Sequence, residues 1–297
     1  MSDFNVGAMG VETGSSVTTL DSEAGIAYAL ATNDPTPLHL DGTFIPPIYA
    51  VVPVWEKVFE VVSGVVPEEH FFSVVHGEQD MIFHQPLRTG LALRSHAIGE
   101  SISVKDSGTT LIVKSESVDD VTGQPVIEQY FTMFYRKVDG GVTFGEPHDN
   151  GLDTDQYGEA ISQGDKSEAF IKVVEAHMDD DQTFRYAQAS GDFMPIHIDD
   201  EFARSVGLGG IIIHGLCTMA QASWAAISAL GDSDPTRLKR MAVRFSHPLR
   251  PGDDLTTTFF IGSGKGSDSE IETYYLVSKR SSDDEIILTN SYVELGK

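Results

Sequence analysis

An aspartate and a histidine stand five residues apart in residues 191–197 (GDFMPIH), with a proline between them. The proline restricts the backbone, which suits a tight loop that turns both side chains into one cleft. A carboxylate with a pKa of about 4 and an imidazole with a pKa of about 6.5 are complementary proton carriers at neutral pH. Asp192 and His197 are therefore the first candidates for acid–base catalysis.

A second histidine, His214, follows His197 after 17 residues and is itself followed by Gly215. The apolar stretch 216–230 then ends at Gly231, a residue type that commonly ends helices, so we predict a helix there. The Gly215 N–H would lie at its N-terminus, where N–H groups and the helix dipole stabilise negative charge. An acid, a base and such a donor are what the addition of water to an activated carbon–carbon double bond requires.

The secondary-structure elements around these residues occur twice, because the chain contains an internal repeat. Residues 28–39 (YALATNDPTPLH) and 186–197 (YAQASGDFMPIH) share six residues at an offset of 158, and 83–90 (FHQPLRTG) matches 245–252 (FSHPLRPG) at an offset of 162. Two matches in the same order at nearly the same offset indicate two copies of one module.

The copies differ around their acid–base pairs. Asp34 and His39 keep the acid–proline–base spacing, but no His-Gly pair follows, and the alignment places Tyr49 there, in a proline-rich stretch. We therefore predict one active site, in the second copy, and treat Asp34 and His39 as the candidate second site.

Both copies show the same order of elements: a helix-prone opening, a longer apolar helix and a series of strands. The strand stretches are rich in Val, Ile, Thr, Tyr and Phe and are separated by Gly, Asp and Ser turns. They are predicted at 90–99, 109–117, 126–136, 241–249, 254–262, 272–280 and 285–295. A helix followed by antiparallel strands implies an α+β module whose sheet wraps around the helix.

Four segments follow from the repeat and the composition. We expect a flexible tail at 1–20, a first module at 21–137, a linker at 138–167 and a second module at 168–297. The linker is rich in Gly and Asp and shows no apolar period, and the tail is small and polar.

The composition excludes several classes of function. The chain has 45 acidic and 20 basic residues, a net charge of −25, so it should repel nucleic acids and anionic membranes. The one cysteine, Cys217, can form neither an intramolecular disulfide nor a cysteine-built metal site. The apolar runs are too short to span a bilayer, and the first 19 residues do not resemble a secretory signal. We therefore expect a cytoplasmic protein.

The second copy resembles the MaoC-like, R-specific enoyl-CoA hydratases, in which Tyr…Ser-Gly-Asp-x-Asn-Pro-x-His precedes an apolar His-Gly helix start. The matching positions here are Tyr186, Ser190, Gly191, Asp192, Pro195, His197, His214 and Gly215. Residues 244–255 (RFSHPLRPGDDL) are similar to the family's Phe…Pro…Pro-Gly-Asp stretch. The resemblance implies a double hotdog fold, an α+β arrangement of two tandem modules. It also implies that the first module is degenerate and accommodates the acyl chain.

The resemblance also implies roles for the residues. Asp192 and His197 would hold a water and add it across a trans-2-enoyl-CoA to give an (R)-3-hydroxyacyl-CoA, or catalyse the reverse dehydration. The Gly215 N–H would stabilise the enolate-like charge on the thioester oxygen, and Met194 and His214 would contact the substrate. For His214 we favour the alternative, a packed side chain at the helix start. No metal or redox cofactor is implied, and a homodimer is the family-level expectation.

Met194 departs from the family pattern, which has asparagine at this position. A thioether donates no hydrogen bond, and the loss of one such bond would slow the reaction roughly 10- to 100-fold. Two alternatives therefore stay open, a 3-hydroxyacyl-acyl-carrier-protein dehydratase and a non-catalytic acyl-thioester-binding protein. The acidity of the chain weighs against the first, because carrier proteins are themselves acidic. The retained catalytic residues weigh against the second.

A cluster of five cations with no acid occupies residues 237–250 (RLKRMAVRFSHPLR). In so acidic a chain this is where a polyanionic coenzyme A is expected to dock, and we predict that Arg240 and Arg244 bind it. The alternative is ordinary surface pairing with nearby aspartates. Neutralising both arginines should raise KM for the thioester, and an unchanged KM would refute the prediction.

Overall fold

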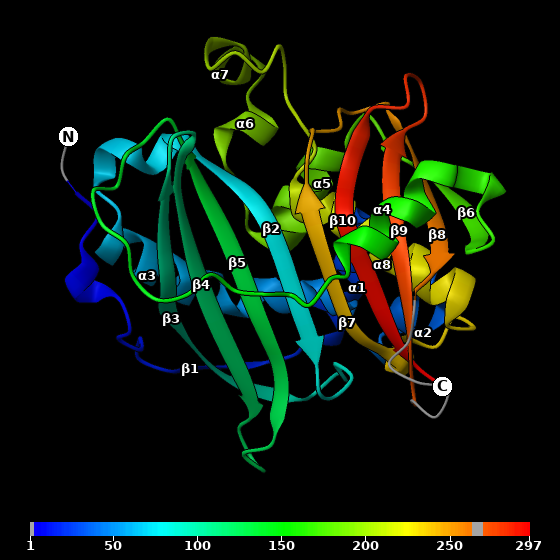
Figure 1. The fold of residues 1–297 in the computed structure, drawn as a ribbon. Helices are drawn as coiled ribbons and strands as arrows, with labels where there is room; N and C mark the ends of the chain where they lie inside the picture. The colour runs from blue at the N-terminus through cyan, green and yellow to red at the C-terminus, as the bar shows by residue number, and fades with distance from the viewer. Residues whose placement is uncertain (1–2, 263–269) are drawn as a thin grey trace. The chain divides into compact units, whose positions relative to one another are not determined.

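The computed structural model describes residues 3–262 and 270–297. The chain divides into two compact units. Unit 1 comprises Met1–Thr19, Pro53–Gln85 and Leu91–Gly151, and unit 2 comprises Leu20–Val52, Pro86–Gly90 and Leu152–Lys297. Each unit combines antiparallel strands with helices (Figure 1), so the predicted α+β class is confirmed.

Unit 1 contains an antiparallel sheet with the strand order β1-β3-β4-β5-β2. Its strands are β1 (Ser16–Thr19), β2 (Val74–Phe83), β3 (Ala92–Lys105), β4 (Gly108–Asp119) and β5 (Pro125–Arg136). Helix α3 (Trp55–Val65) packs against β3 and β4 through Val58, Val61 and Val65, which recur at the helical period of three to four residues.

The first residues do not form the loose tail that we expected. Strand β1 pairs with β3, with Ser16 opposite Ser95, and Phe4 is 2% exposed. The Phe4 ring meets the Tyr135 ring edge-on, with 5.2 Å between the centroids. The anchoring residues stand singly among polar ones, so they leave no apolar period in the sequence.

The strands of unit 2 are also antiparallel and follow the order β7-β10-β9-β8-β6. They are β6 (Phe170–His177), β7 (Leu238–Phe245), β8 (Asp254–Ile261), β9 (Ile271–Arg280) and β10 (Ile286–Gly296). The predicted apolar helix is confirmed as α8 (Gly215–Leu230), which packs against β6, β7 and β8.

The expected linker contains a helix, α4 (Thr154–Gln163), which covers the other face of this sheet. The Asp153 side chain caps the helix by accepting a hydrogen bond from the Gln156 N–H at 3.0 Å. Tyr157 and Ala160 are buried in a cluster with Ala242, Phe260, Tyr275, Val277 and Tyr292. Two apolar positions in a Gly- and Asp-rich stretch were too few to predict the helix.

The compact units group the chain differently from the modules expected at 21–137 and 168–297. Helix α1 (Ser22–Ala31), from the first repeat, lies in unit 2 beside α5 (Gln182–Ser190), from the second. The repeat-related Tyr28 and Tyr186 are both buried, and their hydroxyl oxygens are 3.0 Å apart. A repeat identifies equivalent residues, but it does not say which sheet each helix will join.

Short helical turns join these elements. They are η1 (Val6–Ala8), α2 (Pro37–Leu40), η2 (Pro47–Val54), η3 (Glu68–Ser73), η4 (Gly164–Lys166), α6 (Pro195–Ile198), α7 (Asp200–Ser205) and η5 (Pro235–Arg237).

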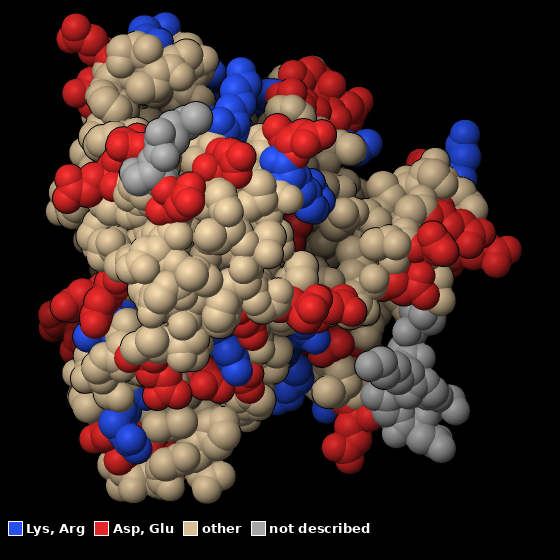
Figure 2. Space-filling view, turned by 60° about the vertical axis from the view of Figure 1, so that its left-hand side comes forward, with Lys and Arg blue, Asp and Glu red and all other residues tan. Residues whose placement is uncertain are grey.

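Acidic side chains are scattered over the face shown in Figure 2, with basic side chains between them, as expected from the net charge. Among the described residues, none of the helices has both the length and the apolar character that crossing a membrane requires.

Candidate active site

Asp192 lies in the turn between α5 and α6. Gly191 ends α5 with a φ of 77°, a left-handed conformation that favours glycine. The Ser190 hydroxyl accepts a hydrogen bond from the Asp192 N–H at 3.2 Å, and Asp192 Oδ1 accepts one from the Met194 N–H at 3.1 Å. The local backbone therefore holds the carboxylate in one orientation.

His197 lies in α6, which begins at Pro195, a favourable first residue for a helix. Its side chain is buried, and Nδ1 lies 2.8 Å from the Ile212 carbonyl oxygen. A carbonyl only accepts, so Nδ1 carries the proton and Nε2 keeps a lone pair. Burial lowers the pKa of His197 below its ordinary value, against the opposing effect of the Asp192 charge. His197 is therefore a neutral imidazole that can accept a proton at Nε2.

His214 packs against His197, with stacked rings whose centroids are 3.7 Å apart. Its Nε2 donates to the backbone carbonyl of Asp192 at 3.0 Å. Burial, together with the neighbouring His197, lowers the pKa of His214 to about 3, so this ring is also neutral. His214 thus links the Asp192 turn to the start of α8, which corresponds to the packed role that we weighed against substrate contact.

Gly215 is the first residue of α8. The N–H groups of Cys217 and Thr218 both donate to the His214 carbonyl, at 3.1 and 3.2 Å. The Gly215 N–H precedes these bonds and has no acceptor within the helix. A Cβ atom on Gly215 would lie 3.2 Å from the Phe245 ring, so the close approach of β7 favours glycine here. This N–H can donate to an oxygen that gains negative charge.

The three side chains Asp192, His197 and His214 bring one potential metal-ligand atom each to within 4.8 Å of one another. The two imidazole rings are stacked at an interplanar angle of 21°, so their in-plane lone pairs do not converge on one point. One ring would have to turn before both could bind the same ion. The arrangement therefore fits proton transfer better than metal binding.

The first repeat closes the corresponding loop with the same two backbone hydrogen bonds. In the first copy, Phe44 donates to Leu38 at 2.9 Å and Ile45 donates to Leu87 at 2.8 Å. In the second copy, the corresponding donors and acceptors are Ile212 to Ile196 at 3.2 Å and Ile213 to Leu249 at 2.8 Å. Leu38 with Ile196, and Leu87 with Leu249, are already equivalent in the sequence repeat.

These bonds make Pro46 and Pro47 the equivalents of His214 and Gly215, in place of the Tyr49 that the sequence alignment suggested. The second copy is longer here because it contains α7 and the turn after it, and this insertion misled the alignment. Proline has no N–H. The first copy therefore lacks the donor that Gly215 supplies.

Asp34 and His39 form a closed pair. His39 Nδ1 lies 2.7 Å from Asp34 Oδ2, and Asp34 Oδ1 accepts from the Thr36 N–H at 2.8 Å. His39 is 0% exposed and Asp34 is 5% exposed. In the second copy a backbone carbonyl pairs with Nδ1, whereas here the acid and the base are bonded to each other.

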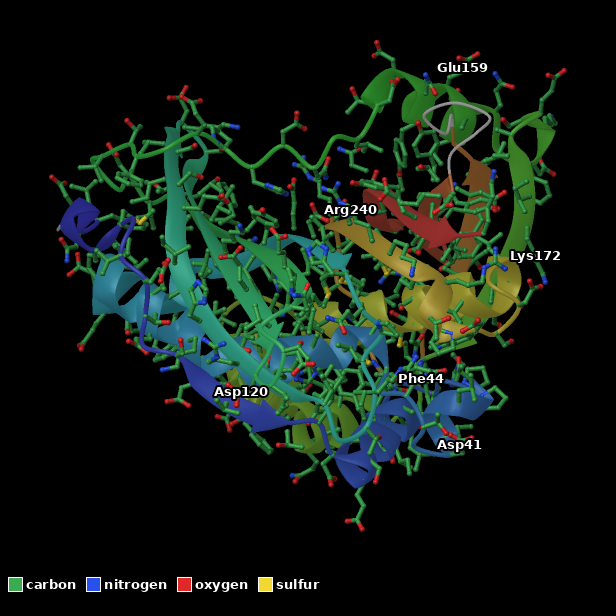
Figure 3. The ribbon with its side chains drawn as sticks, turned by 90° about the horizontal axis from the view of Figure 1, so that it is seen from below. Asp41, Phe44, Asp120, Glu159, Lys172 and Arg240 are labelled. Atoms are coloured by element: carbon green, nitrogen blue, oxygen red, sulfur yellow. The ribbon has the colours of Figure 1, made fainter. Side chains whose placement is uncertain are left out.

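The structure does not bring Arg240 and Arg244 together with these residues. Side chains alternate between the two faces of β7. Phe245 contacts Gly215 on the α8 face, whereas Ala242 packs in the cluster under α4. The Arg240 guanidinium lies 5.4 Å from the ring centroid of Tyr292, a member of that cluster, and Figure 3 labels Arg240 on β7. Arg244 lies four residues after Arg240 on the same strand, so it lies on the same face of the sheet. The coenzyme-binding role of both arginines stays a prediction.

Two contributors to the site were missed at the sequence level. Phe245 begins the second repeated motif and could have been identified from it. The Ile212 carbonyl, which determines which nitrogen of His197 carries the proton, belongs to the backbone, and no pattern of residue types reveals it.

Comparison with known proteins gives two family matches along the chain. Residues 163–280 match the MaoC like domain, and residues 41–137 match the MFE-2 hydratase 2 N-terminal domain. A probable enoyl-CoA hydratase 2 of Dictyostelium discoideum is 28% identical over 216 residues, which cover 71% of this chain and 69% of that protein. The peroxisomal multifunctional enzyme type 2 of Mus musculus is 26% identical over 231 residues, 76% of this chain but 28% of that enzyme.

Solved structures show the same fold. The crystal structure of a MaoC-like dehydratase from Phytophthora capsici has a TM-score of 0.80 at 21% identity and covers 99% of both chains. A Mycobacterium tuberculosis protein described as having a double hotdog fold has a TM-score of 0.61 at 13% identity, over 97% of this chain and 96% of that one. The double hotdog fold expected from the repeat and the resemblance is confirmed.

Proposed function

We propose that this chain, in which residues 163–280 match the MaoC like domain and residues 41–137 match the MFE-2 hydratase 2 N-terminal domain, catalyses the reversible, (R)-specific hydration of trans-2-enoyl-CoA to (R)-3-hydroxyacyl-CoA. One observation carries the proposal. Asp192 and a neutral His197, with its Nε2 lone pair available, lie together beside the start of α8. A carboxylate, a neutral imidazole and a backbone N–H are the groups that this reaction needs.

In the proposed reaction a water molecule is held by the Asp192 carboxylate and His197 Nε2. These two groups remove one proton from the water as its oxygen bonds to C3. The electron pair of the C2–C3 double bond moves toward the thioester, and the Gly215 N–H stabilises the charge that develops on the thioester oxygen. C2 then receives a proton from the same acid–base pair, and the reverse sequence expels water from the hydroxyacyl thioester.

The direct test is the loss of conjugated-enoyl absorbance when the protein is mixed with crotonyl-CoA, followed by chiral analysis of the product. We expect rapid loss and the (R)-3-hydroxy product. If crotonyl-CoA and longer or ring-bearing enoyl-CoA thioesters all bind without loss of absorbance, the chain is an acyl-thioester-binding protein instead. A product of the opposite configuration would contradict the stereochemical part of the proposal.

The pH dependence of kcat/KM should reflect the lowered pKa of His197. A base whose pKa lies below the ordinary value of about 6.5 stays unprotonated to lower pH than an ordinary imidazole does. We therefore expect kcat/KM to fall with decreasing pH, with a midpoint below about pH 6.5. Unfolding curves at each pH provide the control, because the unfolded chain protonates His214 below about pH 6.5 while the folded chain does so only near pH 3. A kcat/KM that falls with a midpoint above pH 6.5 would contradict the assignment.

Replacing Asp34 by asparagine should affect stability rather than catalysis. The substitution disturbs a buried pair, and one unsatisfied buried polar group costs about 1–3 kcal/mol of unfolding free energy. We expect kcat to stay near the wild-type value, because this repeat has Pro47 where the active repeat has the Gly215 N–H. Urea unfolding and steady-state hydration assays measure the two effects. A large loss of kcat in a folded variant would restore Asp34 as a second catalytic site.

A further inference from the structure

The segment that connects α7 to His214 contains a tight turn built on glycine. Gly207, Gly209 and Gly210 have φ values of 85°, 74° and 144°, which side-chain-bearing residues adopt only with strain. The Ile211 N–H is bonded to the Asp200 carboxylate at 3.3 Å. The turn leads directly to Ile212, whose carbonyl accepts the proton of His197 Nδ1.

Two arginines hold the carbonyl oxygens of this turn. The half-buried Arg250 donates from its guanidinium to the Leu208 carbonyl. Arg204 donates to the Gly209 carbonyl at 2.8 Å and pairs with Asp200 at 2.7 Å. The Arg204 and Asp200 side chains are 61% and 55% exposed, so solvent weakens their pairing, and Arg250 is the stronger of the two restraints.

Arg250 lies close against the turn. Ideal Cβ atoms on Gly209 and Gly210 would come within 3.4 and 3.3 Å of its guanidinium nitrogens. Its neighbour Leu249 accepts a hydrogen bond from the Ile213 N–H at 2.8 Å. Consecutive residues of the loop after β7 therefore hold the turn on both sides of Ile212.

We propose that Arg250 is a positioning residue for the hydration reaction, because it holds the Ile212 carbonyl opposite His197 and so keeps His197 in the tautomer with a lone pair on Nε2. The proposal rests on the function proposed above. Without the Arg250 restraint the carbonyl no longer favours a proton on Nδ1, and the tautomer protonated on Nε2 becomes populated. That tautomer cannot accept a proton from water at Nε2.

The chain supplies its own matched control. Arg88 is the equivalent of Arg250 in the repeated motif, and its guanidinium carbon lies 5.4 Å from the ring centroid of Phe44, which corresponds to Ile212 (Phe44 is labelled in Figure 3). Arg88 therefore stabilises the corresponding loop of the repeat whose acid–base pair is closed. Replacing it tests for the general effect of losing an arginine from this motif.

The experiment compares Arg250→Gln, Arg250→Lys and Arg88→Gln with the wild type. We expect Arg250→Gln to lower kcat about tenfold with little change in KM, as for the loss of one hydrogen bond. Arg250→Lys should recover part of that loss, and Arg88→Gln should leave kcat unchanged. Nitrogen-15 spectra of histidine-labelled protein, with His197 assigned by its substitution, should show Nδ1–H in the wild type and in Arg88→Gln. They should show a mixture of tautomers in Arg250→Gln.

The spectra test the proposal separately from the activity. If the wild type hydrates no enoyl thioester, the proposed function fails, but the tautomer of His197 in Arg250→Gln still shows whether Arg250 positions it. An unchanged His197 tautomer in folded Arg250→Gln overturns the proposal, whether kcat falls or not. An equal loss of kcat in Arg88→Gln and Arg250→Gln also overturns it, because the effect would then be general to the fold.

Discussion

Replacing Asp192 by asparagine is expected to lower kcat about 1,000-fold, within the range for the loss of a general acid–base group. Asparagine has nearly the same shape, and its amide oxygen can still accept the Met194 N–H that now bonds to Oδ1. The asparagine side-chain amide cannot take up and release a proton near neutral pH. The loss of enoyl-CoA absorbance measures the rate, and calorimetric titration with a 3-hydroxyacyl-CoA measures binding, which should be largely retained.

The matched control is Asp34→Asn, the same change at the equivalent position of the first repeat. Comparing the two variants removes the general effect of neutralising a carboxylate, since both carboxylates precede a proline and a histidine at the same spacing. We expect the kcat values of the two variants to differ by at least a hundredfold. If Asp192→Asn keeps more than a tenth of the wild-type kcat, Asp192 does not carry the proton transfer.

Replacing Gly215 by proline should lower kcat about 100- to 1,000-fold, because it removes the one N–H that we assign to the thioester oxygen. The backbone around position 215 can accommodate proline. His214 has φ −59° and ψ 135°, the extended conformation that a residue before proline prefers. Proline is also favourable as the first residue of a helix, and Pro47 occupies this position in the first repeat.

The control for this variant is Gly215→Ala, which adds a Cβ at the same place against the Phe245 ring but keeps the N–H. The contact at 3.2 Å requires a small shift of that ring, so we expect a modest loss of kcat for alanine. The difference between the two variants measures the contribution of the N–H. Equal losses would mean that crowding against Phe245, and not hydrogen bonding, explains the effect.

Elements that depend on neighbouring residues were predictable from the sequence. Helix α8 and seven of the strands lie close to their predicted ranges, because apolar period and β-branched content act over a few residues. The Asp192 turn was predictable for the same reason, since Ser190, Gly191 and Pro195 determine it locally. Strands β1, β2 and β6 and helix α4 were missed, because they mix polar and apolar residues and are stabilised by distant partners.

The equivalence of the two copies was predictable only where they have the same length. The ungapped motifs identified Asp34 with Asp192 and His39 with His197, but the insertion of α7 hid the equivalence of Pro47 and Gly215. The backbone hydrogen bonds of the folded chain established this equivalence. Such a hydrogen bond depends on where the loop closes and not on the number of residues in the loop.

The residue types of the site, their spacing and the acidity of the chain follow directly from the amino-acid sequence, because these are properties of the covalent chain and its nearest neighbours. The folded chain was needed to show that His197 presents Nε2, that His214 packs against it, and on which face of the sheet Arg240 lies. Each of these depends on a partner that folding brings from a distant part of the chain. The Ile212 carbonyl is the clearest case, since every residue has such a carbonyl and only the closed turn places this one opposite His197.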